Sequence, residues 1–83
     1  MLHVTKAGYI GDYRIHLVFN DGQSGDVDLS TSLDGPIFVA LKDLDTFRAF
    51  CVEGHTLSWP NGADFAPEYL QSLINCEIIA EQI

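Results

Sequence analysis

Turn residues divide the first third of this 83-residue chain into three short strand-like runs, and this division constrains the fold more than any other feature. Gly11-Asp12 separates the first run from the second, and Asn20-Asp21-Gly22 separates the second from the third. Runs of this kind, joined by loops of two or three such residues, are typical of β-hairpins. Residues 3–29 are therefore expected to form a three-stranded antiparallel meander.

The loop at Gly11-Asp12 sets the register of the first hairpin. A two-residue loop there pairs Ile10 with Tyr13 and Val4 with Phe19. Because alternate side chains of a strand point to opposite faces, this register selects the residues that share the core-facing side. That side is predicted to hold Ile10, Tyr13, Ile15, Leu17 and Phe19. The other side is predicted to hold Thr5, Ala7, Tyr9, Arg14, His16 and Val18.

The second loop, Asn20-Asp21-Gly22, allows two registers for the third strand. A two-residue loop would turn Asp26 and Asp28 toward the core, and burying two carboxylates costs several kcal/mol each. A three-residue loop with Gly22 in the left-handed position of a bulge turns Val27 inward instead. We predict the three-residue loop. Its cross-strand pairs are Ile15 with Val27, Tyr13 with Leu29, Arg14 with Asp28, and His16 with Asp26.

Two short helical segments are expected after the meander. Gly35-Pro36 favours a helical turn, because proline suits the first position of a helix. A second short helix, with the sequence DTFRAF, is predicted to begin at a cap made by Asp43 or Asp45. Phe47 and Phe50 lie three apart in this helix and would share the face that covers the sheet.

The last third of the chain indicates a hairpin, a turn and a closing helix. Residues 50–59 are expected to form two short strands around Glu53-Gly54. Pro60 ends the second strand, Asn61-Gly62 supplies a turn with positive φ, and Pro67 suits the first turn of a helix. The apolar residues of that helix recur at helical spacing, at Tyr69, Leu70, Leu73, Ile74 and Ile78.

The size of the chain allows one modest core. Folding a chain of this length hides only roughly 60–65% of its unfolded surface. A hydrophobic content of 47% nevertheless suits a packed globule. Residues 1–83 are thus predicted to form a single α+β domain. In it, a small antiparallel sheet, built from the N-terminal meander and the later hairpin, packs against short helices and a C-terminal helix.

The charge of the chain limits its partners. Twelve acidic residues against four basic ones give a net charge of −8, which repels phosphate and disfavours direct binding to nucleic acid. The acids are scattered, as expected for a solvated surface or for a surface complementary to a basic protein. The chain shows no basic segment followed by an apolar one at its start, and no apolar run near the length of a membrane span. We expect a cytoplasmic protein without a membrane segment.

The sequence contains no recognisable catalytic or metal-binding pattern. His3, His16 and His55 lack metal-ligand spacing, and Cys51 and Cys76 form neither a zinc knuckle nor a disulfide framework. Both thiols are expected to be reduced and at least half-buried. Neither a nucleophile elbow nor a nucleotide-binding glycine loop occurs. No catalytic residue, metal or cofactor is therefore predicted.

The most distinctive segment is WPNGADFAPEYL, residues 59–70, and it has two interpretations. In the structural one, Asp64 accepts N–H groups of the turn or of the first helical turn, contributing about 1 kcal/mol, and Glu68 favours the positive helix end. In the functional one, the segment is an exposed aromatic and acidic patch that binds a basic partner, since tryptophan is enriched at binding hot spots. The residues of that patch are Trp59, Asn61, Asp64 and Glu68.

Three segments together resemble the small bacterial family known as domain of unknown function 2442. They are HVTKAGYIGDYRIHLVFNDGQSGDVDL, GPIFVALKDLDTFRAF and LSWPNGADFAPEYL, within residues 2–70. The resemblance implies a compact α+β domain with an antiparallel sheet and no established catalytic residues. Longer relatives carry a helix-turn-helix domain, for which residues 71–83 are too few. The resemblance also implies toxin-antitoxin-like gene pairing with a small companion of the domain of unknown function 4160 type.

These observations lead to one main hypothesis and two alternatives. The main one is a non-enzymatic interaction module, an antitoxin-like component that binds a small basic protein. The first alternative is a ligand-sensing or transcription-regulatory accessory domain. The second is a small hydrolase using Asp64 and Glu68, which needs a cleft and perturbed carboxylates. An uncovered sheet edge would also let two copies pair as a homodimer.

Overall fold

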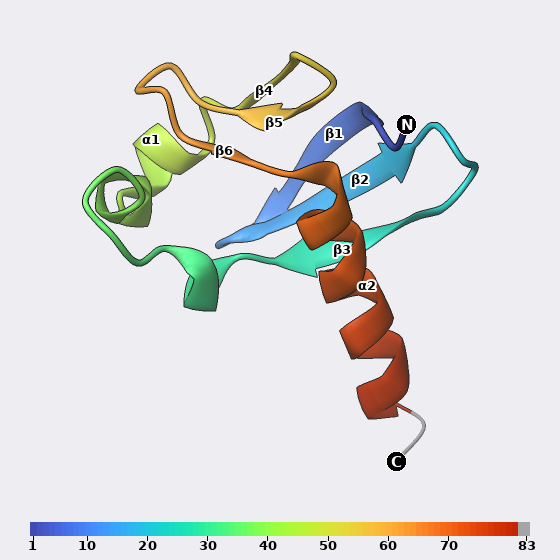
Figure 1. The fold of residues 1–83 in the computed structure, drawn as a ribbon. Helices are drawn as coiled ribbons and strands as arrows, with labels where there is room; N and C mark the ends of the chain where they lie inside the picture. The colour runs from blue at the N-terminus through green and yellow to red at the C-terminus, as the bar shows by residue number, and fades with distance from the viewer. Residues whose placement is uncertain (82–83) are drawn as a thin grey trace.

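The computed structural model describes the backbone of residues 1–81 and the side chains of residues 1–74. Two three-stranded antiparallel sheets and a C-terminal helix dominate the fold (Figure 1). In chain order the strands are β1 (Val4–Gly11), β2 (Arg14–Phe19), β3 (Ser24–Asp28), β4 (Cys51–Glu53), β5 (Thr56–Ser58) and β6 (Asp64–Phe65). The helical elements are η1 (Ser30–Ser32), η2 (Val39–Lys42), α1 (Leu44–Phe47) and α2 (Pro67–Glu81). The predicted α+β class is confirmed.

The hairpin of β2 and β3 has the predicted register. Ile15 lies opposite Val27, and the pairs Arg14 with Asp28 and His16 with Asp26 follow on the outer face. The loop has three residues, and its last one, Gly22, has a φ of +90°. The predicted register is confirmed. Its physical reason is that only this register keeps both aspartates out of the core.

The hairpin of β1 and β2 differs from the prediction in its turn and in the middle of β1. Val4 does pair with Phe19, but Gly11 pairs with Arg14, so the loop is Asp12-Tyr13. Irregularities between Val4 and Lys6 and between Tyr9 and Gly11 shift the intervening pairs by one residue. The predicted inward position of Ile10 is therefore wrong, and its side chain is 47% exposed. The predicted outward positions of Ala7 and Tyr9 are wrong as well, since they lie opposite the inward Leu17 and Ile15.

The shifted turn is explained by what holds Tyr13. Its ring lies edge-on to Phe47, with centroids 5.3 Å apart, and its hydroxyl donates to the carbonyl of Lys42. Asp12 takes a φ of +48°, a left-handed conformation that aspartate tolerates better than most residues. Contacts with a distant segment thus place Tyr13 in the loop rather than in the strand.

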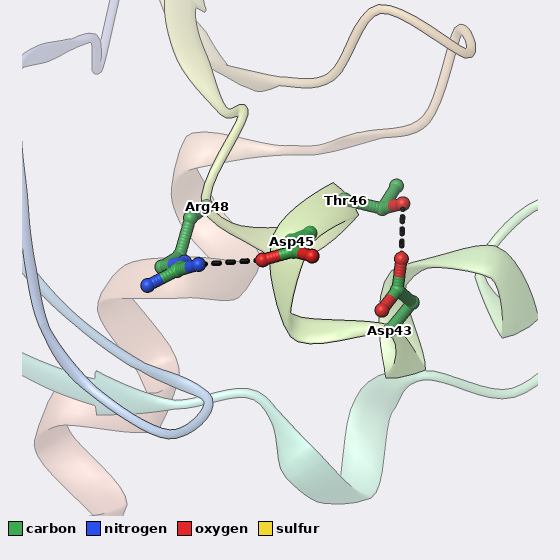
Figure 2. Close-up of polar contacts among 4 residues, drawn as sticks. All are labelled: Asp43, Asp45, Thr46 and Arg48. Carbon is green, nitrogen blue, oxygen red and sulfur yellow. Dashed lines mark hydrogen bonds and ion pairs between the residues drawn. The ribbon is translucent and has the colours of Figure 1, made fainter.

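The two short helical segments form close to the predicted positions. Asp43 precedes α1, and its carbonyl accepts the N–H of Phe47 at 2.9 Å. Its carboxylate accepts the Thr46 hydroxyl at 3.0 Å instead of a backbone N–H, while Asp45 pairs with Arg48 at 2.6 Å (Figure 2). The helix ends at Phe47, which is fully buried, three residues before its predicted end. The prediction that Phe50 lies in this helix is therefore wrong, and the Phe50 ring packs edge-on to Trp59 from the segment that follows.

The second sheet contains one strand more than the predicted hairpin. Its first turn is Gly54-His55, one residue later than expected, and both residues have positive φ. The added strand, β6, pairs Phe65 with Leu57 and Asp64 with Ser58. Two residues are too few to show the alternation by which a strand is recognised in a sequence.

Helix α2 packs on the inner face of the first sheet. Glycine allows the close approach, because a Cβ on Gly25 would lie 2.9 Å from Cγ2 of Ile74. The β2–β3 loop is also tied to the helix, since the Asp21 carboxylate accepts the side-chain N–H of Gln71 at 3.0 Å. The same carboxylate accepts the backbone N–H of Gln23 within the loop, also at 3.0 Å. These two hydrogen bonds, the backbone one first, lower the pKa of Asp21.

The core lies where the inner face of the first sheet meets the second sheet and α2. The buried apolar residues are Val4, Ile15, Leu17, Phe19, Val27, Leu29, Leu33, Leu41, Phe47, Leu57, Trp59, Ala63, Phe65, Leu70 and Ile74. Four of the predicted helix stripe, Tyr69, Leu70, Leu73 and Ile74, contact or border this core, and Ile78 lies outside the described side chains. Within residues 1–81, no helix has the length and apolar character needed to cross a bilayer.

Candidate functional site

Trp59 is part of the core and does not form an exposed anchor. Its side chain is 3% exposed, and its indole N–H donates to the carbonyl of Phe47 at 2.8 Å. The ring packs edge-on to Phe65, with centroids 5.7 Å apart. Because Trp59 follows two residues after the buried Leu57, it points to the same inner side. The predicted exposure of Trp59 is therefore wrong.

Asn61 organises the turn that follows. Its side-chain oxygen accepts the N–H of Ala63 at 3.0 Å, and its side-chain N–H donates to the carbonyl of Ile37 at 3.1 Å. The N–H of Trp59 donates to the carbonyl of Ala63 at 2.9 Å, which closes the turn around Gly62 with its φ of +93°. The polar atoms of Asn61 are thus occupied by bonds within the chain.

Asp64 and Glu68 are both exposed but lie in different surroundings. Asp64 lies opposite Ser58 on the outer side of the second sheet, because its neighbour Phe65 points into the core. None of the described residues donates a hydrogen bond to the Asp64 carboxylate, so the expected capping bond does not form. Glu68 stands in the first turn of α2, where its charge favours the positive helix end.

The four residues of the predicted patch therefore do not form one surface. Trp59 is buried and Asn61 is used by the turn, while Asp64 and Glu68 remain free at the surface. Residues 1–81 contain no pocket next to the two carboxylates or elsewhere. Among the described side chains, no group of three histidines, cysteines or carboxylates could hold a metal ion.

A row of aromatic rings that no sequence pattern predicts joins two distant segments. Phe38 stacks on Phe65 at a centroid distance of 4.9 Å, and Phe65 stacks on Tyr69 at 5.7 Å. The Tyr69 hydroxyl lies 2.6 Å from Oγ of Ser32. Tyr69 and Ile37, the residue before Phe38 in the chain, are each 42% exposed. The apolar helix spacing identified Tyr69 as a packing residue, but only the folded chain brings it to this row.

The two sheets meet at a pair of stacked histidines. The rings of His3 and His55 lie 4.0 Å apart at an angle of 13°, and the N–H of Val4 donates to the carbonyl of His55 at 2.9 Å. The pKa of His3 is lowered, chiefly by desolvation of the ring and secondly by the neighbouring His55 ring and the N-terminal ammonium. The nearby Glu68 carboxylate acts in the opposite direction.

The acidic residues dominate the surface. Glu77 and Glu81 lie beyond the described side chains, so ten of the twelve acids can be placed. None of the ten is buried. Asp26 pairs with His16 at 2.8 Å and Asp45 pairs with Arg48 at 2.6 Å. Ten less these two leaves eight carboxylates without an ion-pair partner among the described side chains.

Cys51 also differs from expectation. Its thiol is free and exposed on β4 rather than half-buried, with its sulfur 3.7 Å from Oγ of Ser58.

The fold and its surface define a small acidic α+β domain with two antiparallel sheets. The chain belongs to the family described as "Protein of unknown function (DUF2442)", whose sequence profile matches residues 4–74. The match begins at the first residue of β1 and ends at Ile74, the α2 residue that contacts Gly25. No curated protein and no solved structure is significantly similar to the chain.

Proposed function

We propose that this protein is a non-enzymatic interaction module, an antitoxin-like component that binds a small basic protein. The observation that carries the proposal is the set of eight surface carboxylates without an ion-pair partner among the described side chains. Such a surface attracts a basic protein from a distance and selects against acidic ones. The family resemblance supports a small companion of the domain of unknown function 4160 type as that partner.

Two of the four residues predicted to bind the partner belong to the proposed acidic surface. Asp64 and Glu68 stay in the acidic surface because both are exposed. Trp59 leaves it, since its indole is buried, and Asn61 leaves it because its amide is bonded within the chain. We assign the complex to the cytoplasm, where an exposed thiol such as Cys51 stays reduced.

The test begins with affinity purification of the tagged protein from its native host, at physiological and at high salt, with mass spectrometry of the bound proteins. A basic protein recovered in equal amount is then purified, and its affinity for the acidic chain is measured by calorimetry over a range of salt concentrations. We expect one-to-one binding that weakens steeply with salt, because exposed charges are screened beyond about 8 Å at physiological ionic strength.

Two outcomes would contradict the proposal. One is recovery of the protein alone at both salt concentrations. The other is a complex whose affinity does not change with salt, because such a complex would not depend on the carboxylates.

A further inference from the structure

The outer edge of β3 has backbone groups without partners among the described residues. β3 is the last strand of the first sheet, with only β2 beside it among the described strands. The N–H of Phe19 donates to the carbonyl of Gln23, and the N–H of Leu29 donates to the carbonyl of Tyr13, both at 2.9 Å. Gln23 and Leu29 therefore point their backbone groups toward β2. Along an antiparallel strand, every second residue does so, and Gly25 belongs to the same set as Gln23 and Leu29. The backbone groups of Ser24, Asp26 and Asp28 consequently point away from the sheet.

Helix α2 extends past this edge. The contact of Ile74 with Gly25 marks the point where the helix crosses β3. From Ile74 to Glu81 the helix advances about 10 Å, at roughly 1.5 Å per residue. A further strand would lie only about 4.8 Å beyond β3. Figure 1 shows α2 crossing β3 and continuing beyond it, so the helix backbone overhangs the place of a fourth strand.

The outer face of the edge carries negative charge. The side chains of Asp26 and Asp28 lie on the face away from α2, because the inward Val27 lies between them. Asp26 is 43% exposed and interacts with His16, while Asp28 accepts the N–H of Ser30 at 2.9 Å. Both carboxylates can still accept hydrogen bonds from a strand placed beside β3, since each oxygen has more than one acceptor site.

We propose that the outer edge of β3, beneath the overhanging end of α2, binds an extended segment of a basic protein that has lysine or arginine at alternate positions. Main-chain hydrogen bonds to Ser24, Asp26 and Asp28 extend the sheet, which is a common mode of peptide recognition. The basic residues face the two carboxylates, and the intervening apolar residues face α2. This inference rests on the proposed function and adds the site and mode of binding.

A second copy of the chain fits the same edge less well. In an antiparallel pair centred on Asp26, this residue faces its own equivalent, and like charges directly opposite each other destabilise a sheet. Charged side chains on an exposed edge are also a usual protection against self-association. Charge complementarity therefore selects a basic strand over a second β3.

The test uses a short, end-capped peptide of alternating lysine and valine as the probe, with alternating glutamate and valine as the control peptide. Amide hydrogen exchange of the full chain is followed by NMR with and without each peptide. We expect the lysine peptide to slow exchange at the amides of Ser24, Asp26 and Asp28. The glutamate peptide should leave these amides unchanged.

A pair of matched variants separates the edge from general charge. Asp26→Asn with Asp28→Asn keeps an acceptor oxygen for His16 and for Ser30 but removes two charges, and should weaken binding of the lysine peptide about 5-fold. Asp64→Asn with Glu68→Gln removes two charges elsewhere and should change it less than about 2-fold.

Four results would overturn the inference. Slowed exchange at other amides would place the peptide elsewhere, and equal weakening by both double variants would reduce the binding to net charge. Slowed exchange at Ser24, Asp26 and Asp28 that grows with protein concentration alone would make a second copy the occupant. If the native basic partner binds the Asp26→Asn, Asp28→Asn variant unchanged, this site is wrong while the proposed function stands. Absence of any basic partner contradicts the function itself.

Discussion

The turn at residues 59–63 and the edge of β3 use their polar groups in opposite ways. In the turn, the indole N–H of Trp59 and both polar atoms of Asn61 have partners within the chain. At the edge, the backbone groups of Ser24, Asp26 and Asp28 have no strand beside them among the described residues. The polar groups of the turn are thus used within the fold, whereas those of the strand edge are the ones that we propose for binding.

The largest effect is expected from Trp59→Ala, which tests the folding role of the turn. Removing a buried indole leaves a cavity and an unpaired carbonyl on Phe47, so the free energy of unfolding should fall by about 3–5 kcal/mol. Urea denaturation followed by circular dichroism measures it. Trp59→Phe, which keeps most of the packing but loses the N–H, should cost about 1–3 kcal/mol. Equal stability of Trp59→Ala and the native chain would contradict the burial of the indole.

Gly25→Ala tests how closely α2 packs on β3. The new Cβ would lie 2.9 Å from Cγ2 of Ile74, so the Ile74 side chain or the helix that carries it must shift, at a cost of about 1–3 kcal/mol. The same denaturation experiment detects this loss. In a double-mutant cycle, Ile74→Ala should remove most of the added cost of Gly25→Ala. Additive costs would show that the alanine does not act through Ile74.

Asn61→Ala tests the hydrogen bonds of the turn alone. Loss of the bonds to Ala63 and to Ile37 should lower the free energy of unfolding by about 1–2 kcal/mol. Asn61→Asp keeps the acceptor for the N–H of Ala63 but loses the donor to the carbonyl of Ile37. Its free energy of unfolding should lie between those of the native chain and of Asn61→Ala. If Asn61→Ala is as stable as the native chain, the amide does not hold the two segments together.

The histidine pair between the sheets should make stability depend on pH. Since the pKa of His3 is lowered on folding, the unfolded chain binds the proton more tightly. Stability is then fully present above the ordinary value of 6.5 and is lost as the pH falls from there toward the lowered pKa. His55→Ala should reduce this loss, because it removes the neighbouring imidazole. An NMR titration that gives His3 a pKa at or above 6.5 would contradict the expectation.

The smallest effect is expected at the β3 edge. Asp26→Asn with Asp28→Asn should change the free energy of unfolding by no more than about 0.5 kcal/mol, as for most surface substitutions. Denaturation under the conditions used for Asn61→Ala gives the direct comparison. A loss as large as that of Asn61→Ala would mean that the carboxylates support the fold, and the contrast between the two regions would disappear.

Local physical chemistry explains which parts of the fold could be predicted from the sequence. The register of β2 and β3 follows from the cost of burying Asp26 and Asp28, which the sequence displays directly. The turn before β2 could not be found this way, because Tyr13 is held by Phe47 and by the carbonyl of Lys42. Such contacts join segments that are far apart in the chain.

The candidate site was predicted less well for the same reason. An aromatic residue beside a turn can be exposed or buried, and the carbonyl of Phe47 that satisfies Trp59 comes from another element. The exposure of Asp64 and Glu68 followed from their charge. The free edge of β3 depends on strand order and on the path of α2, neither of which composition or spacing reveals.

The burial of Trp59 gives the protein a built-in optical reporter. The chain has one tryptophan, so all of its indole fluorescence comes from this position in the core. Emission should be blue-shifted in the native state and move to longer wavelength on unfolding. A strand that binds at the edge of β3 does not touch the indole, so the same spectrum should stay constant while the peptide binds. A tryptophan emission spectrum can thus distinguish a variant that no longer binds the peptide from a variant that no longer folds.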